Sequence, residues 1–172
     1  MTFAKRCIIL YYRIKEMFKR VTIFCLFGFL LEASEWKKLL QQCQKGAGSA
    51  CTQIGYMYDK AFNLPKDDYQ AVKYYSLGCE LGDQRGCVNL GVMWEKEQAN
   101  LKRDPKKIMQ LFSDACEEEY GVGCYFLGLS YEEGKLVKKD LTKAYHYYHQ
   151  ACNLGVEEAC VKEEELNFKS HK

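Results

Sequence analysis

Apolar residues recur along this chain with the three- and four-residue spacing of amphipathic helices. Ala71, Tyr74 and Tyr75 are spaced in this way, and the same spacing continues at Leu90 and Trp94. A strand would instead alternate at every second residue, so the pattern predicts helices rather than a sheet. Glycine-containing turns divide the pattern into short segments, which predicts pairs of helices.

Eight cysteines divide the chain into four similar units. The second cysteine of each pair lies eight residues after the first, and the first members follow one another at intervals of 36, 37 and 36 residues. The pairs are Cys43 with Cys51, Cys79 with Cys87, Cys116 with Cys124, and Cys152 with Cys160. Because a two-helix unit cannot bury its own apolar face, it must stack on its neighbours. We therefore expect an all-α, right-handed α/α superhelical solenoid of about four helix-turn-helix repeats.

The turn inside each unit is marked by the residue three positions after the first cysteine. Glycine stands there in three units, as Gly46, Gly82 and Gly155, and allows a helix to end with positive φ. The third unit has Glu119 at this position, and we expect its turn to have a different shape.

Three aspartates in the linkers are expected to cap helix N-termini through their side-chain oxygens. They are Asp68, Asp104 and Asp140. Three glycines lie inside the second helices, where each costs about 1 kcal/mol relative to alanine, so we expect a neighbouring helix to approach closely. They are Gly55, Gly91 and Gly128. The last unit loses this pattern and becomes charged over residues 160–165, as a terminal cap would.

The amino end resembles a secretory signal. Lys19 and Arg20 precede an uninterrupted apolar run over residues 21–31, which ends in small residues near Ser34. At 1.5 Å per residue the run spans only about 16 Å, roughly half of a bilayer core, so we expect no stable membrane insertion. We predict a cleaved segment over residues 1–33, followed by a repeat domain over residues 34–172. Residues 1–16 are either a long basic region or the product of a mis-assigned start.

Charge excludes a nucleic-acid partner. The whole chain has 25 basic and 23 acidic residues, and removing residues 1–33 leaves 19 basic and 21 acidic residues. The remaining domain therefore has a net charge of −2, with no basic stripe and no recognition motif for nucleic acids.

The cysteine spacing favours a disulfide scaffold. A step of eight residues across a turn places both sulfurs on facing helices, so a bridge within each pair is reasonable. Eight cysteines allow 105 connectivities, and local pairing is favoured because it makes the repeats uniform. The sequence contains no Cys-x-x-Cys, which argues against a metal site, a cofactor or redox catalysis. An even number of cysteines behind an export segment indicates a secreted or periplasmic protein.

The repeated motif resembles the Sel1-like repeats, which are related to tetratricopeptide repeats, and among them the Helicobacter cysteine-rich proteins. It is most complete in Lys143-Ala144-Tyr145-His146-Tyr147-Tyr148-His149-Gln150-Ala151-Cys152-Asn153-Leu154-Gly155, and the resemblance covers about residues 35–166. It implies secreted, disulfide-linked α/α repeats, several of which bear a β-lactamase or penicillin-binding name. The resemblance supplies no catalytic residue.

An enzymatic function has weak support in the residues. Ser34-Glu35-Trp36-Lys37 matches the Ser-x-x-Lys motif of serine β-lactamases, but it lies at the predicted cleavage site and lacks the companion motifs. His146 and His149 lie one helical turn apart without an evident third metal ligand. Weak β-lactam hydrolysis therefore stays the alternative.

Recognition is the favoured function. Solenoids present a concave groove, which we expect to bind a peptide or protein of the host or cell envelope; a β-lactam or peptidoglycan fragment is a further candidate ligand. The candidate groove residues are Gln53, Asn89, Tyr125, His146 and His149. The paired tyrosines and the tryptophan of the repeats are expected to form core and inter-repeat contacts. They are Tyr74, Tyr75, Tyr147, Tyr148 and Trp94.

Overall fold

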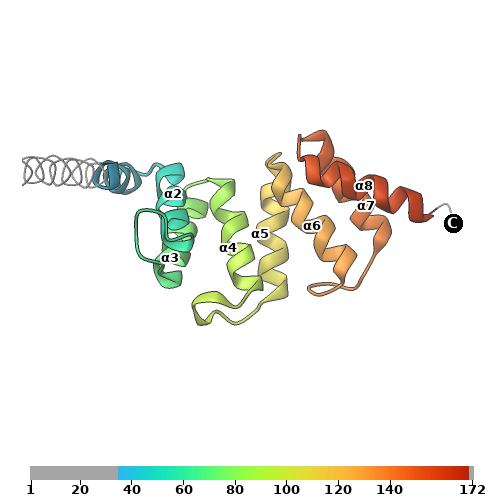
Figure 1. Cartoon of the computed structure of the whole chain (residues 1–172), viewed down its shortest axis with the longest axis horizontal. Helices are drawn as coiled ribbons and strands as arrows, with labels where there is room; N and C mark the ends of the chain where they lie inside the picture. The colour runs from blue at the N-terminus through green and yellow to red at the C-terminus, as the bar shows by residue number, and fades with distance from the viewer. Residues whose placement is uncertain (1–34, 171–172) are drawn as a thin grey trace, which may run out of the picture. The chain divides into compact units, whose positions relative to one another are not determined.

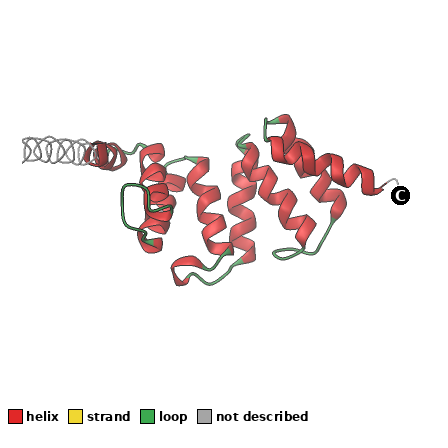
Figure 2. Cartoon of the chain, viewed as in Figure 1, coloured by secondary structure: helices red, strands yellow, loops and turns green. Residues whose placement is uncertain are grey.

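The computed structural model describes residues 35–170, and these residues form helices and loops without a strand (Figure 2). Residues 39–170 belong to one compact unit, whereas residues 35–38 belong to a separate one. The predicted signal over residues 1–33 lies outside the described residues. Among the residues described, no helix combines the length and hydrophobicity needed to cross a bilayer.

Each helix of the compact unit packs mainly against the helices that precede and follow it in sequence (Figure 1). A helix over residues 35–44 precedes α2, and a short 3-10 turn, η1, lies in the linker after α4. The elements are α2 (Gly48–Asp59), α3 (Asp68–Glu80), α4 (Gln84–Glu95), η1 (Gln98–Asn100), α5 (Pro105–Glu117), α6 (Gly121–Glu133), α7 (Leu141–Asn153) and α8 (Glu157–Ser170). This arrangement confirms the predicted α/α solenoid of four helix pairs.

Four disulfides lie within the repeats, and each joins the first helix of a repeat to the second. Their Cα–Cα distances lie between 4.6 and 4.8 Å, and each closes a sequence separation of eight residues. They join Cys43 to Cys51, Cys79 to Cys87, Cys116 to Cys124, and Cys152 to Cys160. In the chain-entropy model, closing a loop this short contributes about 2.5 kcal/mol.

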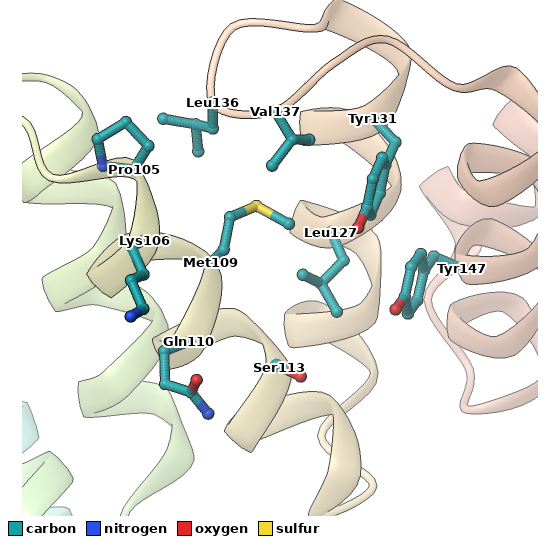
Figure 3. A pocket seen from close by; sticks show the side chains of 10 residues that line it. All are labelled: Pro105, Lys106, Met109, Gln110, Ser113, Leu127, Tyr131, Leu136, Val137 and Tyr147. Carbon is teal, nitrogen blue, oxygen red and sulfur yellow. The ribbon is translucent and has the colours of Figure 1, made fainter.

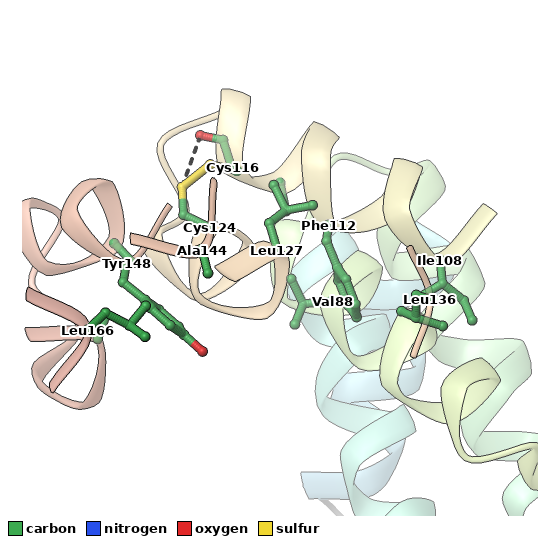
Figure 4. Packing of buried hydrophobic residues seen from close by; sticks show 13 residues of the cluster. Val88, Ile108, Phe112, Cys116, Cys124, Leu127, Leu136, Ala144, Tyr148 and Leu166 are labelled. Carbon is green, nitrogen blue, oxygen red and sulfur yellow. Dashed lines mark hydrogen bonds between the residues drawn. A yellow bond between two sulfur atoms is a disulfide. The ribbon is translucent and has the colours of Figure 1, made fainter. Parts of the chain in front are cut away.

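The glycines inside the second helices lie against buried aromatic rings of the next repeat. A Cβ atom added to any of them would lie 2.6 Å from a ring carbon. Gly55 faces Tyr75, Gly91 faces Phe112, and Gly128 faces Tyr148. Figure 4 shows Phe112 and Tyr148 within the cluster of buried residues that joins the third and fourth repeats. The expected close approach of neighbouring helices is therefore confirmed.

The turn at Glu119 has the same shape as the turns at glycine, so the expectation of a different shape was wrong. Glu119 has a φ of 58°, in the left-handed region that Gly46, Gly82 and Gly155 also occupy. Each of these four residues donates its N–H to the carbonyl of the first cysteine, at 2.9 to 3.1 Å. The hydrogen bonds of the turn therefore override the conformational preference of the residue.

The predicted helix caps are correct at two linkers and wrong at the third. Asp104 and Asp140 each accept a hydrogen bond from the backbone N–H three residues later. In the first linker the cap is Asp67, whose Oδ1 accepts from Gln70 N at 3.0 Å. Asp68 is instead the first residue of α3, because the helix begins one residue earlier than a cap at Asp68 would require.

Candidate functional site

A groove of about 530 Å³ lies between the third and fourth repeats (Figure 3). Helix α5 forms one wall, α6 and the 134–140 loop form the floor and one end, and Tyr147 of α7 closes the opposite wall. The lining residues are Pro105, Lys106, Met109, Gln110, Ser113, Leu127, Tyr131, Leu136, Val137 and Tyr147. We refer to this feature as the α5–α7 groove.

The centre of the groove is apolar and its α5 edge is polar. Leu127 and Leu136 are buried beneath it, at 2% and 8% exposure, and Met109 projects between them (Figure 3). Lys106 and Gln110 lie along the α5 edge. An apolar centre with a few polar groups at its edge is the usual composition of a ligand-binding cleft.

A stacked pair of tyrosines forms the wall opposite α5. The rings of Tyr131 and Tyr147 are 5.7 Å apart and nearly parallel, at 5°, and the ammonium group of Lys143 lies 5.2 Å from the Tyr131 centroid. Burial raises the pKa of the Tyr147 hydroxyl above its usual value, and neighbouring Tyr131 raises it further. The same junction one pair of repeats earlier stacks Tyr58 on Tyr74, with centroids 6.0 Å apart. A stacked tyrosine pair therefore occurs at two of the junctions between repeats.

The two ends of the groove differ in charge. Lys106 is the one charged side chain among the described lining residues, and it forms no ion pair with any described carboxylate. Towards the other end of α5, Gln110 Nε2 donates to Asp114 at 2.6 Å and Ser113 Oγ donates to Glu117 at 3.0 Å. The groove is therefore basic where α5 begins and acidic beyond its other end.

The structure places three of the predicted groove residues elsewhere. Gln53 lines a separate hollow of about 450 Å³ that also includes Arg85. Asn89 is partly buried on α4, and Tyr125 packs with its ring centroid 5.8 Å from that of Tyr148. None of these three residues lines the α5–α7 groove, and their part in ligand binding stays a prediction.

The two predicted histidines lie on the exposed side of α7. The edge of His146 meets Tyr147 with centroids 5.9 Å apart. His149 Nδ1 lies 2.7 Å from Glu163 Oε1, and the His149 ring stacks with that of Tyr145 at 6.3 Å. Within residues 35–170, no group of three or more potential ligands could hold a metal ion.

Most residues of the α5–α7 groove were not predicted from the sequence. Met109 and Gln110 lie between the apolar positions of α5 that recur in each repeat, so the pattern predicts that both side chains are exposed. Leu136 and Val137 belong to the 134–140 linker, whose three lysines are typical of an exposed polar turn. Leu136 is nevertheless buried. The apolar Leu-Val pair within that polar linker is the one local sign of the groove.

Comparison with known proteins identifies the repeat. The Sel1 repeat model matches residues 48–83 and 121–156. Helicobacter pylori "Beta-lactamase HcpA" is 42% identical over 65 residues, which is 38% of this chain and 24% of that protein. Helicobacter pylori "Beta-lactamase HcpB" is 43% identical over 81 residues, which is 47% of this chain and 54% of that protein. The chain thus spans between about a quarter and about half of the length of these relatives.

Solved structures agree with this identification. A Sel1 repeat protein from Oxalobacter formigenes matches with a TM-score of 0.65 at 24% identity, over 76% of this chain and 98% of that one, which supports the fold. The Helicobacter pylori cysteine rich protein B matches with a TM-score of 0.56 at 31% identity, over 73% of this chain and 94% of that one. The repeat motif, the four disulfides and these matches together show that the chain belongs to the Sel1-repeat family, in the group of cysteine-rich proteins that includes HcpB.

Proposed function

We propose that this protein is a recognition module that binds an extended peptide segment of another protein in the α5–α7 groove. The observation that carries the proposal is the groove itself: an apolar centre, a polar edge and one uncompensated lysine, formed by helices of two repeats. Sel1 repeats stack into surfaces of this kind, and solenoid grooves suit extended ligands.

The lining residues suggest the chemistry of the peptide. The space around Met109, Leu127 and Leu136 accepts one apolar side chain, and Lys106 at the end of the groove favours a carboxylate beside it. Gln110 can hydrogen-bond to a peptide backbone while it stays on the rigid α5 helix. Because the wall tyrosines already stack in the free protein, little conformational entropy is lost on binding.

Selection from a randomised peptide library on the immobilised protein tests the proposal. Peptides with an apolar residue next to an acidic one should be enriched, and Met109→Lys should weaken their binding by about tenfold or more. Phe62→Lys is the matched control, because Phe62 is a 59% exposed apolar residue of another linker. Absence of enrichment, or equal loss of binding in both variants, would contradict a binding function for this groove.

We also propose that the chain is exported and works in the periplasm or outside the cell. Four disulfides within residues 35–170 support an oxidising compartment, and residues 1–33 have the composition of a cleaved signal. Non-reducing peptide mapping with N-terminal sequencing of the cellular protein tests this. Free thiols, or a retained Met1, would refute export.

A second candidate function is hydrolysis of a β-lactam, the activity that the names of two relatives carry. The supporting observation is the hydroxyl of Ser113 in the α5–α7 groove, which donates to Glu117 at 3.0 Å. Turnover of a chromogenic lactam should then scale with protein concentration, survive repurification and disappear in Ser113→Ala. Turnover that persists in this variant would assign the activity to a contaminant or to another site.

A further inference from the structure

The repeats of this solenoid join through a defined stripe on the second helix of each pair. On α6, Gly121 lies against Leu154, and Gly128 lies against the ring of Tyr148. Further along the same stripe, Glu132 Oε2 accepts a hydrogen bond from the Tyr148 hydroxyl at 2.7 Å. The positions of this stripe therefore determine what can stack on a repeat.

On α8, the stripe at the equivalent positions has a different composition. Val161 and Phe168 are 56% and 67% exposed, and they alternate with exposed Glu157 and Glu164. Glu164 occupies the position at which the earlier second helices have glycine. A repeat that presents an aromatic ring to this position, as the internal repeats do, would meet a long acidic side chain, so α8 is not shaped for a regular successor.

The first repeat has the complementary departure from the pattern. Leu39 stands where the later repeats have a buried aromatic ring that packs on a glycine of the preceding repeat. Leucine is smaller than that ring, whereas Glu164 on α8 is larger than the glycine that it replaces. Lys45 lies exposed two residues after Cys43 and borders the 450 Å³ hollow with Leu39 and Gln42. This face is basic and recessed, whereas the stripe on α8 is acidic and projects apolar side chains.

Aligning the repeats also shows which residues would come into contact if the fourth repeat stacked on a first repeat. Lys45 corresponds to Leu81 and Leu154, whose Cβ atoms lie 3.1 and 2.8 Å from a Cβ placed on Gly48 and Gly121. The residue that corresponds to those two glycines on α8 is Glu157. Stacking the fourth repeat on a first repeat therefore brings Glu157 to Lys45, and neither forms an ion pair with another described residue.

We propose that the α8 stripe docks on the Leu39–Lys45 face of a second copy of this chain, so that molecules associate head to tail. The two faces are complementary in charge, because Lys45 would meet Glu157. They are also complementary in size, because the smaller Leu39 would meet Glu164, which is larger than the glycine of the other repeats. Gln42 stands where the later first helices have glycine or alanine, so the copies meet less closely than adjacent repeats and the contact is reversible. A heterologous contact leaves one free face at each end and continues beyond a dimer.

Sedimentation velocity and light scattering on the protein recovered from an exporting host test the proposal over about a hundredfold range of concentration. The mean mass should rise past that of a dimer with concentration, and salt should reduce the association. Lys45→Glu and Glu157→Lys should each weaken association by about fivefold or more, and the double variant should restore most of it. Lys96→Glu, an exposed lysine at the end of α4, is the matched control.

All three charge variants lie on the surface, so their circular dichroism and melting curves should match those of the parent protein. A mass independent of concentration would refute the contact, as would association that ends at a dimer. Equal effects of Lys45→Glu and Lys96→Glu, or a double variant no better than the single ones, would also refute it. Peptide binding in the α5–α7 groove is measured separately and does not depend on this result.

Discussion

Replacing Glu119 by glycine should stabilise this protein. Glu119 has a φ of 58°, a conformation that costs an ordinary L-residue about 1–2 kcal/mol. Glycine removes this cost but adds about 0.4–1 kcal/mol of entropy to the unfolded chain. The expected net gain in the free energy of unfolding is therefore about 0.5–1 kcal/mol, which corresponds to about 2–4 °C in Tm.

Two further substitutions serve as controls for this prediction, one at the adjacent residue and one at the equivalent turn of the second repeat. Glu118 has a φ of −83°, so Glu118→Gly relieves no strain and should lower the free energy of unfolding by about 0.5–1 kcal/mol. Gly82 has a φ of +84° and no atom within 4 Å of an added Cβ, so Gly82→Ala isolates the backbone cost. It should lower stability by about 1 kcal/mol.

Urea unfolding with the disulfides intact, followed by far-UV circular dichroism, gives the midpoints of all three variants. The midpoint should rise for Glu119→Gly and fall for the other two. If Glu119→Gly lowers the midpoint as much as Glu118→Gly does, the third turn does not have the left-handed geometry of the others, and the reasoning fails.

Three other substitutions test the junctions and the charges. Gly128→Ala should lower the free energy of unfolding by about 1–3 kcal/mol in urea titration, because its Cβ would lie 2.6 Å from the Tyr148 ring. Tyr148→Phe removes the hydrogen bond to Glu132 and should cost about 1–2 kcal/mol in the same assay, without a change in helix content. Burial alone would raise the pKa of Asp83, but the hydrogen bonds of Arg85 outweigh this effect and hold the pKa below its usual value. Its contribution is complete above the unfolded pKa and is lost as pH falls through the lower folded value, so Asp83→Asn should flatten the loss of stability below about pH 4, measured by thermal melts.

The repeat made the architecture predictable from the sequence. Helix pairs, their stacking and the local disulfides all follow from one period, and Gly55 predicted a close contact because glycine has little other reason to lie within a helix. Glu119 shows the limit of such reasoning. Its residue type disfavours the observed turn, yet the helices on both sides and their hydrogen bonds fix the backbone.

The groove was not predictable for a different physical reason. Its position depends on the angle at which α7 stacks on α6, and on how Leu136 of the linker joins the buried cluster that includes Ile108 and Leu127. Neither is encoded in the spacing of apolar residues along a single helix. The residues predicted from the start of the second helices, such as Gln53, lie at another part of the surface.

The four disulfides within residues 35–170 link residues eight apart, and none of them connects one repeat to the next. Under a pulling force applied to the two ends of the chain, only the backbone joins neighbouring repeats covalently, and no cross-link among the described residues holds them against each other. The chain should lengthen in steps as the junctions between repeats open one after another. Each disulfide should keep the turn that it closes from extending. When the force is released, each repeat still holds its turn, so the repeats can stack again from four local starting points. Extension of the chain at the junctions would therefore break only non-covalent contacts, such as the hydrogen bond from Tyr148 to Glu132, and would leave every one of these disulfides intact.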